Sequence, residues 1–280
     1  MINLWLRTDT GVVSLSLNWI DVQNLDFYHL LFLERHHLMW FAKSHSKDKV
    51  LAIALKAHPE VLWYFKRLLP EAAEVFENMA GSVSPDLSGE EIRRAEIEVM
   101  RSINDWMVYV VDPAIYDRLE FTRWDDSELT DFVDFSGRRV VDIGAGTGRL
   151  SFVAASRGAT VYAVEPVRTL RDYLKRKAET IGYKRFYVVD GLIEEIPFED
   201  DFADIVISGH VFGDFPDREY GEMVRVVRNG GDIVLFPGNN DTDNEIHDFL
   251  AGKGFGWGRF EEPGTGFVRK YRLKVEKRSL

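Results

Sequence analysis

The residues best suited to chemistry stand in one short run, in which an aspartate is followed by three glycines at alternate positions. Asp142 lies among β-branched residues, the glycines are Gly144, Gly146 and Gly148, and an apolar-periodic segment covers 150–155. This order predicts a buried strand, a tight turn and a helix. Because glycine has no Cβ, it allows positive φ and close approach of a ligand to the backbone. The run therefore indicates a cofactor site, although glycines that only close a strand-to-helix turn would give the same pattern.

The spacing of these glycines disfavours a dinucleotide site. The dinucleotide-binding turn G-x-G-x-x-G would need glycine at position 149, where the chain has Arg149. A second predicted strand, 159–164, ends next to Glu165. A carboxylate at that place can accept hydrogen bonds from both hydroxyls of a ribose. Glu165 therefore indicates a nucleoside cofactor without distinguishing one such cofactor from another.

The composition excludes several classes of site. The chain has no cysteine, so disulfides, thiolate metal sites and cysteine-adduct chemistry on pyrimidines are ruled out. Its 46 acidic residues exceed its 35 basic ones, and the net charge of −11 disfavours nucleic acid as a partner. No apolar run reaches the roughly 18 residues of a membrane span, and no signal-peptide pattern opens the chain. We therefore expect a cytoplasmic enzyme.

Residues 1–118 predict a mainly helical domain that opens with a small hairpin over 2–17. Helices are expected over 25–45, 49–56, 59–69, 70–79 and 90–110. Ser88 or Gly89 is the expected cap of the last of these helices. Glu34 and His37 are the one pair of possible metal ligands at helical spacing, and without a second pair we expect no metal site.

From about residue 119 the pattern alternates between strands and helices. Strands are predicted over 140–143, 159–164, 185–189, 202–208, 232–236, 255–260 and 267–276. Helices are predicted over 127–135, 168–181, 220–228 and 243–252. A glycine-rich connection, 263–266, joins the last two strands. The alternation predicts an α/β fold with a doubly wound sheet over 119–280.

Further motifs accompany the glycine run and Glu165. Residues 190–206 follow the pattern of an acid, a short loop, a P-F pair, an acidic turn and a closing strand, with an alanine before Asp204. Residues 222–231 follow E-x-x-R-V-x-x-x-G-G, with Asn229 where a proline is usual. Taken together, the motifs resemble the class I S-adenosylmethionine-dependent methyltransferases, above all those of quinone-biosynthesis type. The resemblance covers 119–280 and implies a seven-stranded sheet with an antiparallel last strand.

The resemblance implies S-adenosylmethionine as the cofactor, with S-adenosylhomocysteine as its product. In that family pattern Asp142 would hold the amino group of the methionine half, Glu165 the ribose, Val167 the adenine face and Asp190 the adenine amino group. The expected cofactor-binding residues are Asp142, Gly144, Ala145, Gly146, Gly148, Glu165, Pro166, Val167, Asp190, Gly191, Leu192, Ser208 and Gly209.

Two residues are expected near the methyl group that is transferred. His210 follows the fourth strand of the sheet and could act as a general base, since histidine exchanges protons near neutral pH, or could only wall the pocket. Tyr116 resembles a tyrosine that folds over the cofactor in small-molecule methyltransferases, although a buried tyrosine is equally good structural material. Other polar residues that could orient a substrate are Asp214, Asp217, Asn239, Asn240 and Asp241.

These expectations lead to a methyltransferase acting on a small molecule, with the helical domain as its acceptor side or lid. Methyl transfer is an in-line displacement that asks mainly for alignment and desolvation. The segment 208–213 lacks the N/D-P-P-Y run of enzymes that methylate the amino groups of bases or glutamine amides. The alternatives are a protein or RNA methyltransferase and a catalytically silent cofactor-binding module. The sequence leaves the methylated atom and the oligomeric state open.

Overall fold

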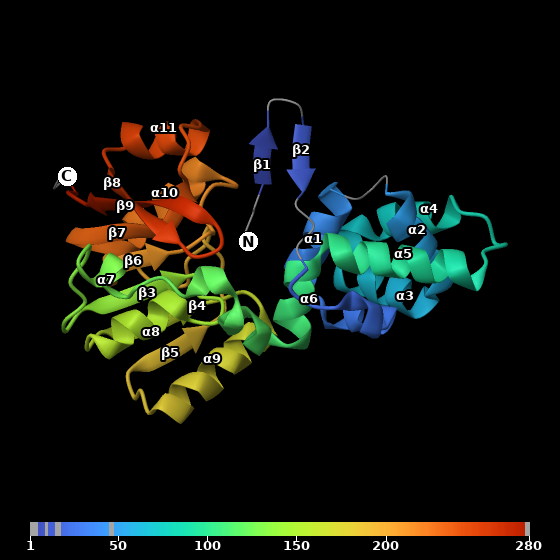
Figure 1. Cartoon of the computed structure of the whole chain (residues 1–280), viewed down its shortest axis with the longest axis horizontal. Helices are drawn as coiled ribbons and strands as arrows, with labels where there is room; N and C mark the ends of the chain where they lie inside the picture. The colour runs from blue at the N-terminus through green and yellow to red at the C-terminus, as the bar shows by residue number, and fades with distance from the viewer. Residues whose placement is uncertain (1–4, 9–10, 15–17, 45–47, 278–280) are drawn as a thin grey trace. The chain divides into compact units, whose positions relative to one another are not determined.

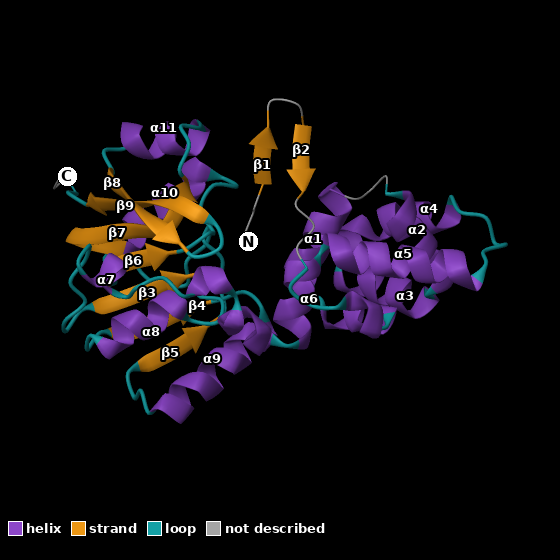
Figure 2. Cartoon of the chain, viewed as in Figure 1, coloured by secondary structure: helices purple, strands orange, loops and turns teal. Residues whose placement is uncertain are grey.

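The computed structural model describes residues 5–8, 11–14, 18–44 and 48–277. The chain divides into two compact units, one ending at Ile115 and the other beginning at Tyr116 (Figure 1). The first unit is largely helical, and the second combines helices with a large sheet (Figure 2). This division assigns Tyr116 to the second unit. No helix among the described residues is long and apolar enough to cross a membrane.

The N-terminal unit begins with an antiparallel hairpin and continues as short helices. The hairpin strands are β1 (Trp5–Thr8) and β2 (Gly11–Ser14), which confirms the predicted hairpin. The helices are η1 (Val22–Asn24), η2 (Phe27–Phe32), α1 (Arg35–Ser44), α2 (Lys49–Ala57), α3 (Pro59–Leu68), η3 (Pro70–Ala72), α4 (Ala73–Gly81), α5 (Gly89–Ser102) and α6 (Asn104–Val111). Fully buried aliphatic and aromatic side chains such as Leu51, Phe65 and Phe76 form its core.

Two helices that the pattern predicts as continuous are interrupted. The expected helix 90–110 breaks at Ile103, where the side chain of Asn104 accepts a hydrogen bond from the Trp19 N–H (2.6 Å) and donates one to Ile20 O (2.9 Å). The expected helix 25–45 breaks at Leu33, whose backbone is extended. Contacts between residues far apart in the sequence cause the first break, so no local pattern reveals it. Ser88, by contrast, caps α5 as predicted, in a reciprocal pair with Glu91.

The second unit contains a seven-stranded sheet in the order β5-β4-β3-β6-β7-β9-β8 (Figure 1). The strands are β3 (Arg139–Ile143), β4 (Thr160–Val164), β5 (Phe186–Val189), β6 (Ala203–Ser208), β7 (Val227–Asn240), β8 (Gly256–Glu262) and β9 (Gly266–Lys274). The first five strands in this order, β5, β4, β3, β6 and β7, are parallel to one another, whereas β9 is antiparallel to both of its neighbours. The predicted doubly wound α/β sheet with an antiparallel last strand is confirmed.

The helices of this unit lie mostly between its strands in the sequence. They are η5 (Glu120–Thr122), α7 (Ser127–Thr130), α8 (Arg149–Ser156), α9 (Arg168–Ile181), α10 (Pro216–Val226) and α11 (Glu245–Gly252), and η4 (Pro113–Arg118) spans the boundary between the two units. The predicted bounds of α9 are confirmed. The predicted helix 127–135 is wrong in its length, because the chain turns after Thr130. The predicted strand 232–236 is likewise too short, since β7 continues to Asn240 as a partner of β9.

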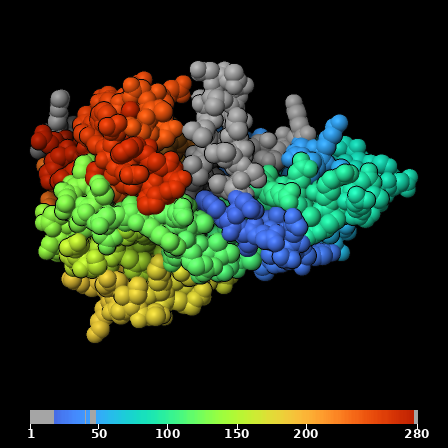
Figure 3. Space-filling model, in the orientation of Figure 1, coloured from blue at the N-terminus to red at the C-terminus, as the bar shows by residue number. Residues whose placement is uncertain are grey.

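The central strands are buried on both faces, which explains their nearly continuous apolar sequence. Successive residues of a strand point to opposite faces, so Val140 belongs to one apolar cluster and Val141 to the other. The sheet edges lie far apart on the surface, with the yellow α9 region at one end of the unit and the red C-terminal strands at the other (Figure 3).

The order of the strands also locates the natural ligand crevice of the sheet. From β3 the chain crosses first to β4 on one side and later to β6 on the other, so the strand order reverses between β3 and β6. Ile143 and Ser208, the last residues of these two strands, are register partners. In open α/β sheets ligands bind outside the carboxyl ends of the strands at this reversal. The turns that follow β3 and β6 therefore meet where a ligand is expected.

Candidate functional site

A pocket lies at this reversal and is lined by residues of the second unit. The space within its walls, about 460 Å³, includes open solvent, so the pocket is a partly open recess. The lining residues are Tyr116, Phe121, Thr122, Trp124, Asp142, Gly144, Ala145, Gly146, Thr147, Arg149, Leu150, Gly209, His210, Phe236 and Pro237. They come from β3 and the turn after it, the turn after β6, the start of α8, the second half of β7 and the segment before α7.

The turn after β3 needs its glycines. Gly144, Gly146 and Gly148 adopt φ of 67°, 56° and 93°, a region that residues with a Cβ rarely enter. A Cβ on Gly144 would overlap the side chain of Val211, and one on Gly148 would overlap Phe152. The N–H groups of Gly144 and Ala145 both donate to Val164 O, at 2.8 and 3.1 Å. The turn is thus held against β4 while its backbone lines the pocket.

Asp142 places a carboxyl group at the floor of this pocket. Its side chain is buried, and the Ser151 hydroxyl donates to Oδ2 at 2.6 Å, whereas Oδ1 has no hydrogen-bond partner. Burial raises the pKa of Asp142 to about 7, and the nearby Glu165 adds to the rise while the bond from Ser151 opposes it. A buried oxygen without a partner is costly. A ligand that brings a donor or a positive charge would relieve that cost.

Glu165 closes the glycine turn from the next strand. Its Oε2 accepts a hydrogen bond from the Gly146 N–H at 2.8 Å, and Oε1 accepts one from the Val167 N–H at 2.9 Å. The residue is buried, and burial raises its pKa above the ordinary value of a glutamate, against the effect of these two backbone bonds. The carboxylate therefore fixes the turn at the place where a ribose-binding acid is predicted.

His210 follows β6 and contributes the second of the two turns that meet at the pocket. Its φ of 59° is unusual for a residue other than glycine, and its N–H donates to Pro237 O at 3.0 Å. Its Nε2 lies 3.1 Å from Oε1 of Glu262, and the ring of Phe121 meets the imidazole edge to face at 6.0 Å. Backbone strain of this kind tends to gather at functional sites.

The loop that carries His210 is fixed by a buried acid. Glu219, fully buried in α10, accepts hydrogen bonds from the Gly213 N–H at 2.6 Å and the Phe215 N–H at 2.8 Å. Burial raises the pKa of Glu219, against the effect of these two bonds. The loop in turn presents Val211 to the space that a side chain at Gly144 would need.

The segment 116–124, which we call the strap, forms a further wall of the pocket. Asp117 accepts hydrogen bonds from the Tyr173 hydroxyl and the Lys177 ammonium, both at 2.6 Å, and Lys177 also reaches Thr147 O at 3.1 Å. The Arg149 guanidinium donates to Thr122 O at 2.7 Å and to Trp124 O at 2.6 Å, and it lies over the Trp124 ring. The strap is therefore anchored to α8, to α9 and to the glycine turn.

The structure brings seven of the predicted site residues together in the pocket. They are Tyr116, Asp142, Gly144, Ala145, Gly146, Gly209 and His210. The other predicted site residues, Gly148, Glu165, Pro166, Val167, Asp190, Gly191, Leu192 and Ser208, do not line it.

Those other residues belong mostly to the turns after β4 and β5. Asp190 is largely exposed and lies 3.1 Å from the Arg171 guanidinium, and Leu192 is also exposed. Ser208 is buried and donates to Ile143 O at 2.9 Å, a contact that ties β6 to β3. Their expected roles toward the adenosine half stay predictions.

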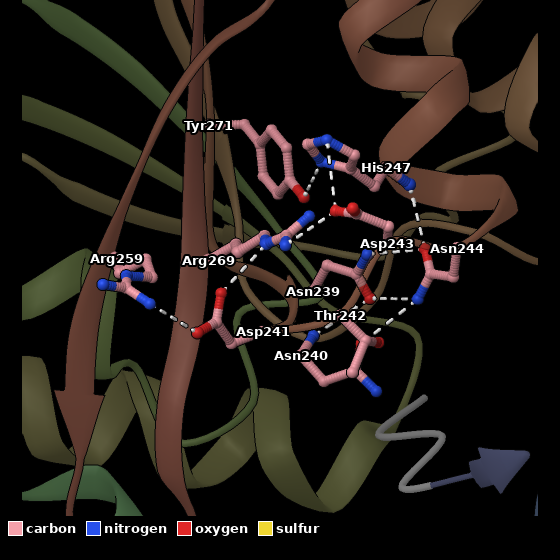
Figure 4. A network of polar contacts seen from close by, with 10 residues as sticks. All are labelled: Asn239, Asn240, Asp241, Thr242, Asp243, Asn244, His247, Arg259, Arg269 and Tyr271. Carbon is pink, nitrogen blue, oxygen red and sulfur yellow. Dashed lines mark hydrogen bonds and ion pairs between the residues drawn. The ribbon is translucent and has the colours of Figure 1, made fainter. Parts of the chain in front are cut away.

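Three of the five polar residues expected at the rim of the pocket, Asn239, Asn240 and Asp241, belong to one network of polar contacts (Figure 4), whereas Asp217 pairs with Lys253. The side-chain amides of Asn239 and Asn244 bond each other at 2.8 and 3.1 Å. Asp241 accepts hydrogen bonds from Arg269 and Arg259, both at 3.1 Å. This network fixes the end of β7 against β9 and α11, so its members have a structural use whether or not a substrate meets them.

Several residues of the site were not predicted. Thr147 and Arg149 belong to the glycine run itself, and their place in the run is a signal that could have included them. Phe121 and Glu262 gave no such signal, because they contact His210 directly but lie far from it in the sequence.

Comparison with known proteins relates part of this unit to a protein family. The sequence profile of a family described as "Methyltransferase domain" matches residues 141–235, which include the glycine turn, Glu165 and His210. An uncharacterized methyltransferase of Geobacillus thermodenitrificans is 32% identical over 114 residues, covering 39% of this chain and 51% of that protein. Residues 141–235, about a third of the chain, therefore carry a methyltransferase domain. Together with the motifs of the glycine turn and Glu165, this match implies S-adenosylmethionine as the cofactor of that domain.

Other known proteins are similar to parts of this chain. An uncharacterized methyltransferase of Mycobacterium tuberculosis is 35% identical over 101 residues, which are 36% of this chain and 40% of that protein. The crystal structure of an S-adenosylmethionine-dependent methyltransferase from Aquifex aeolicus has 21% identity and a TM-score of 0.47, covering 59% of this chain and 99% of that one. The chain spans about half the length or less of the curated relatives it matches.

The pocket of the methyltransferase domain fits this cofactor in two respects. S-adenosylmethionine carries an ammonium and a sulfonium, and the unpartnered Oδ1 of Asp142 offers a buried acceptor for a cationic donor. The backbone of the glycine turn lines the pocket, and at Gly146 a Cβ would meet nothing closer than 4.0 Å, so a ligand can approach the backbone there. The residues present are thus compatible with the cofactor of the family.

Proposed function

We propose that this chain transfers a methyl group from S-adenosylmethionine to a small-molecule acceptor. The observation that carries the proposal is the pocket at the reversal of the sheet, where the unpartnered Oδ1 of Asp142 and the glycine turn line one space together with His210 and Tyr116. The proposal assigns the first pair to cofactor binding and the second pair to the acceptor side.

The expected division of labour follows from what each group can do. Asp142 would hold the cofactor's ammonium, and the backbone of the glycine turn would lie against its methionine half. Glu165 would accept hydrogen bonds from the ribose in addition to those from the backbone, since each carboxylate oxygen has two acceptor sites. The bound cofactor supplies a methyl carbon that its sulfonium already activates. The residues around it need only align the acceptor and exclude water.

The aromatic residues that the strap adds to the wall of the pocket favour a small acceptor over a macromolecule. Tyr116, Phe121 and Trp124 of the strap line the pocket beside the glycine turn, so an acceptor there would be enclosed by aromatic side chains. The net charge of −11 also disfavours RNA as the acceptor. A protein acceptor and a module that binds the cofactor without turnover are the competing functions.

Transfer of a labelled methyl group from S-adenosylmethionine into an extract of the source organism tests the proposal. After incubation with the full chain, the extract is separated into small-molecule, protein and RNA fractions. We expect label in the small-molecule fraction, lost with Asp142→Ala and retained with Asp131→Ala, an exposed aspartate of the same domain. Label in protein or RNA alone would contradict the small acceptor, and binding of cofactor without any transfer would favour the silent module.

A further inference from the structure

His210 and Glu262 form a pair that no local sequence pattern reveals. Glu262 is the last residue of β8, 52 positions after His210, and its Oε1 lies 3.1 Å from the imidazole Nε2. Only 2% of the Glu262 side chain is exposed, against 24% of the His210 side chain. The His210 side chain therefore lines the pocket, whereas the Glu262 side chain is buried and does not line it.

A buried carboxylate needs a partner, because removal of its charge from water is costly. The imidazole supplies a donor for Glu262, and the two groups are held from different sides. The backbone N–H of His210 is bonded to Pro237 O, and Thr265 N–H closes the turn after β8 onto Glu262 O at 3.1 Å. The ring of Phe121 limits the imidazole on another side. The orientation of the imidazole is therefore set by its surroundings.

The pairing also selects the tautomer of the imidazole. A carboxylate only accepts hydrogen bonds, so the hydrogen of the neutral ring must sit on Nε2. Nδ1 is then left with its lone pair and can accept a proton. An acid that holds a histidine in this way is how a general base is oriented in enzymes that activate hydroxyl nucleophiles.

We propose that Glu262 is a positioning residue that makes His210 a general base, and that the acceptor is therefore a small molecule methylated on a hydroxyl group. This inference rests on the proposed function. The hydroxyl oxygen forms the bond to the methyl carbon, the carbon–sulfur bond breaks with its electron pair left on sulfur, and the hydroxyl proton passes to Nδ1 of His210. A neutral amine attacks without help from a base, whereas a hydroxyl oxygen becomes a strong nucleophile only as its proton leaves, so a hydroxyl acceptor makes the most use of this base.

The first test reads the tautomer without any acceptor. Long-range proton–nitrogen correlation spectra of the full chain labelled with ¹⁵N-histidine report which ring nitrogen carries hydrogen, and His210→Asn identifies the signals of His210. Asparagine is chosen because it tolerates positive φ. We expect hydrogen on Nε2 in the wild type and in Glu261→Gln, an exposed change on the neighbouring residue, and a shifted tautomer balance in Glu262→Gln. Hydrogen on Nδ1 in the wild type, or a tautomer balance that Glu262→Gln does not change, would overturn the pairing.

The second test measures transfer to the small-molecule fraction of the extract. A general base contributes on the order of 100-fold or more to the rate, so we expect Glu262→Gln to lower kcat about 100-fold while the Kd of S-adenosylhomocysteine changes less than about twofold. Glu262→Asp should retain a higher kcat than Glu262→Gln. In a protein that already carries His210→Asn, adding Glu262→Gln should lower kcat little further. Wild-type turnover in Glu262→Gln, or independent losses in the double variant, would overturn the positioning role.

The two proposals fail in different ways. If the wild-type protein binds the cofactor but transfers no methyl group, the proposed function is overturned. The tautomer measurement tests the His210–Glu262 pair independently of that result. When transfer occurs, the fragmentation pattern of the purified product identifies the methylated atom. Methyl on oxygen supports the hydroxyl acceptor, and methyl on nitrogen or carbon overturns it.

Discussion

At the scale of single residues, the ionised form of Asp142 lowers the stability of the protein but favours binding of a cationic ligand. Its buried carboxyl has one oxygen without a partner, and burial raises its pKa to about 7. Ionisation of this group therefore destabilises the protein without ligand, although the ionised form is the one that would bind a cationic cofactor. Binding sites commonly keep such locally unfavourable groups.

Replacement of Asp142 by asparagine should make the unfolding free energy less dependent on pH. The folded-state pKa lies above the unfolded one, so the stability from the protonated carboxyl is full at low pH and is lost as pH rises toward 7. Between pH 5 and pH 8 the wild type should lose about 2–3 kcal/mol relative to Asp142→Asn. Urea denaturation curves at both pH values measure the difference.

The same variant should bind S-adenosylmethionine at least roughly 10-fold more weakly at pH 8, because a charge-assisted hydrogen bond is lost. Asp131→Asn, an exposed change of the same kind, serves as the control for both measurements. Equal pH profiles for the wild type and Asp142→Asn would show that the carboxyl is not the titrating group.

At the scale of elements, the glycine turn allows a matched comparison between two positions of similar φ. Gly144 has φ of 67° and a Cβ there would overlap Val211, whereas Gly137 has φ of 68° and nothing within 4 Å of its Cβ position. Gly137→Ala should cost roughly 1–2 kcal/mol of stability from its backbone alone. Gly144→Ala should cost about 1–3 kcal/mol more, from overpacking.

Thermal unfolding of both glycine variants tests this expectation, with isothermal titration of S-adenosylhomocysteine beside it. Gly144→Ala should also lose affinity, since its Cβ displaces the loop that carries His210, and Gly137→Ala should keep it. The same cost at the two positions would mean that Val211 moves away without penalty.

The strap gives a second prediction at this scale. Asp117→Asn removes the charge that holds Lys177 and Tyr173, while the Arg149 anchors remain. We expect the Kd of S-adenosylhomocysteine to rise about 3- to 10-fold while global stability falls by less than about 1 kcal/mol, as is usual for a partly exposed ion pair. Asp172→Asn on α9, whose ion pair with Arg168 is largely exposed, is the control. An unchanged Kd would mean that the strap does not order the pocket.

Elements whose signals are local were predictable from the sequence, and contacts between distant residues were not. The bounds of α9 follow from its apolar stripe and from Gly182, which ends it at φ of 93°. The glycine turn and the acid after β4 also follow from local spacing. The break at Asn104 and the pair of His210 with Glu262 depend on tertiary contacts across 84 and 52 positions. No periodicity or motif encodes such contacts.

At the scale of the whole molecule, the two units differ in what their sequences disclose. The methyltransferase domain repeats a family pattern, so its fold and cofactor follow from motifs. The N-terminal unit shows apolar periodicity and little else, and periodicity reports a packed core rather than a ligand. A role of that unit as acceptor side or lid remains a proposal, and it calls for a measurement that reads both units in one experiment.

Hydrogen exchange of the full chain, with and without S-adenosylhomocysteine, is that measurement. At about 100 times its Kd a ligand stabilises the protein that binds it by about 2.7 kcal/mol. We expect slower exchange in the glycine turn, the strap and the loop of His210, and unchanged exchange in α2 and α5, because every residue that lines the pocket lies in the second unit. If the N-terminal unit closes over the acceptor, its exchange should slow only when the acceptor-containing extract fraction is added as well. Protection of α2 or α5 by S-adenosylhomocysteine alone would show that the cofactor itself couples the two units.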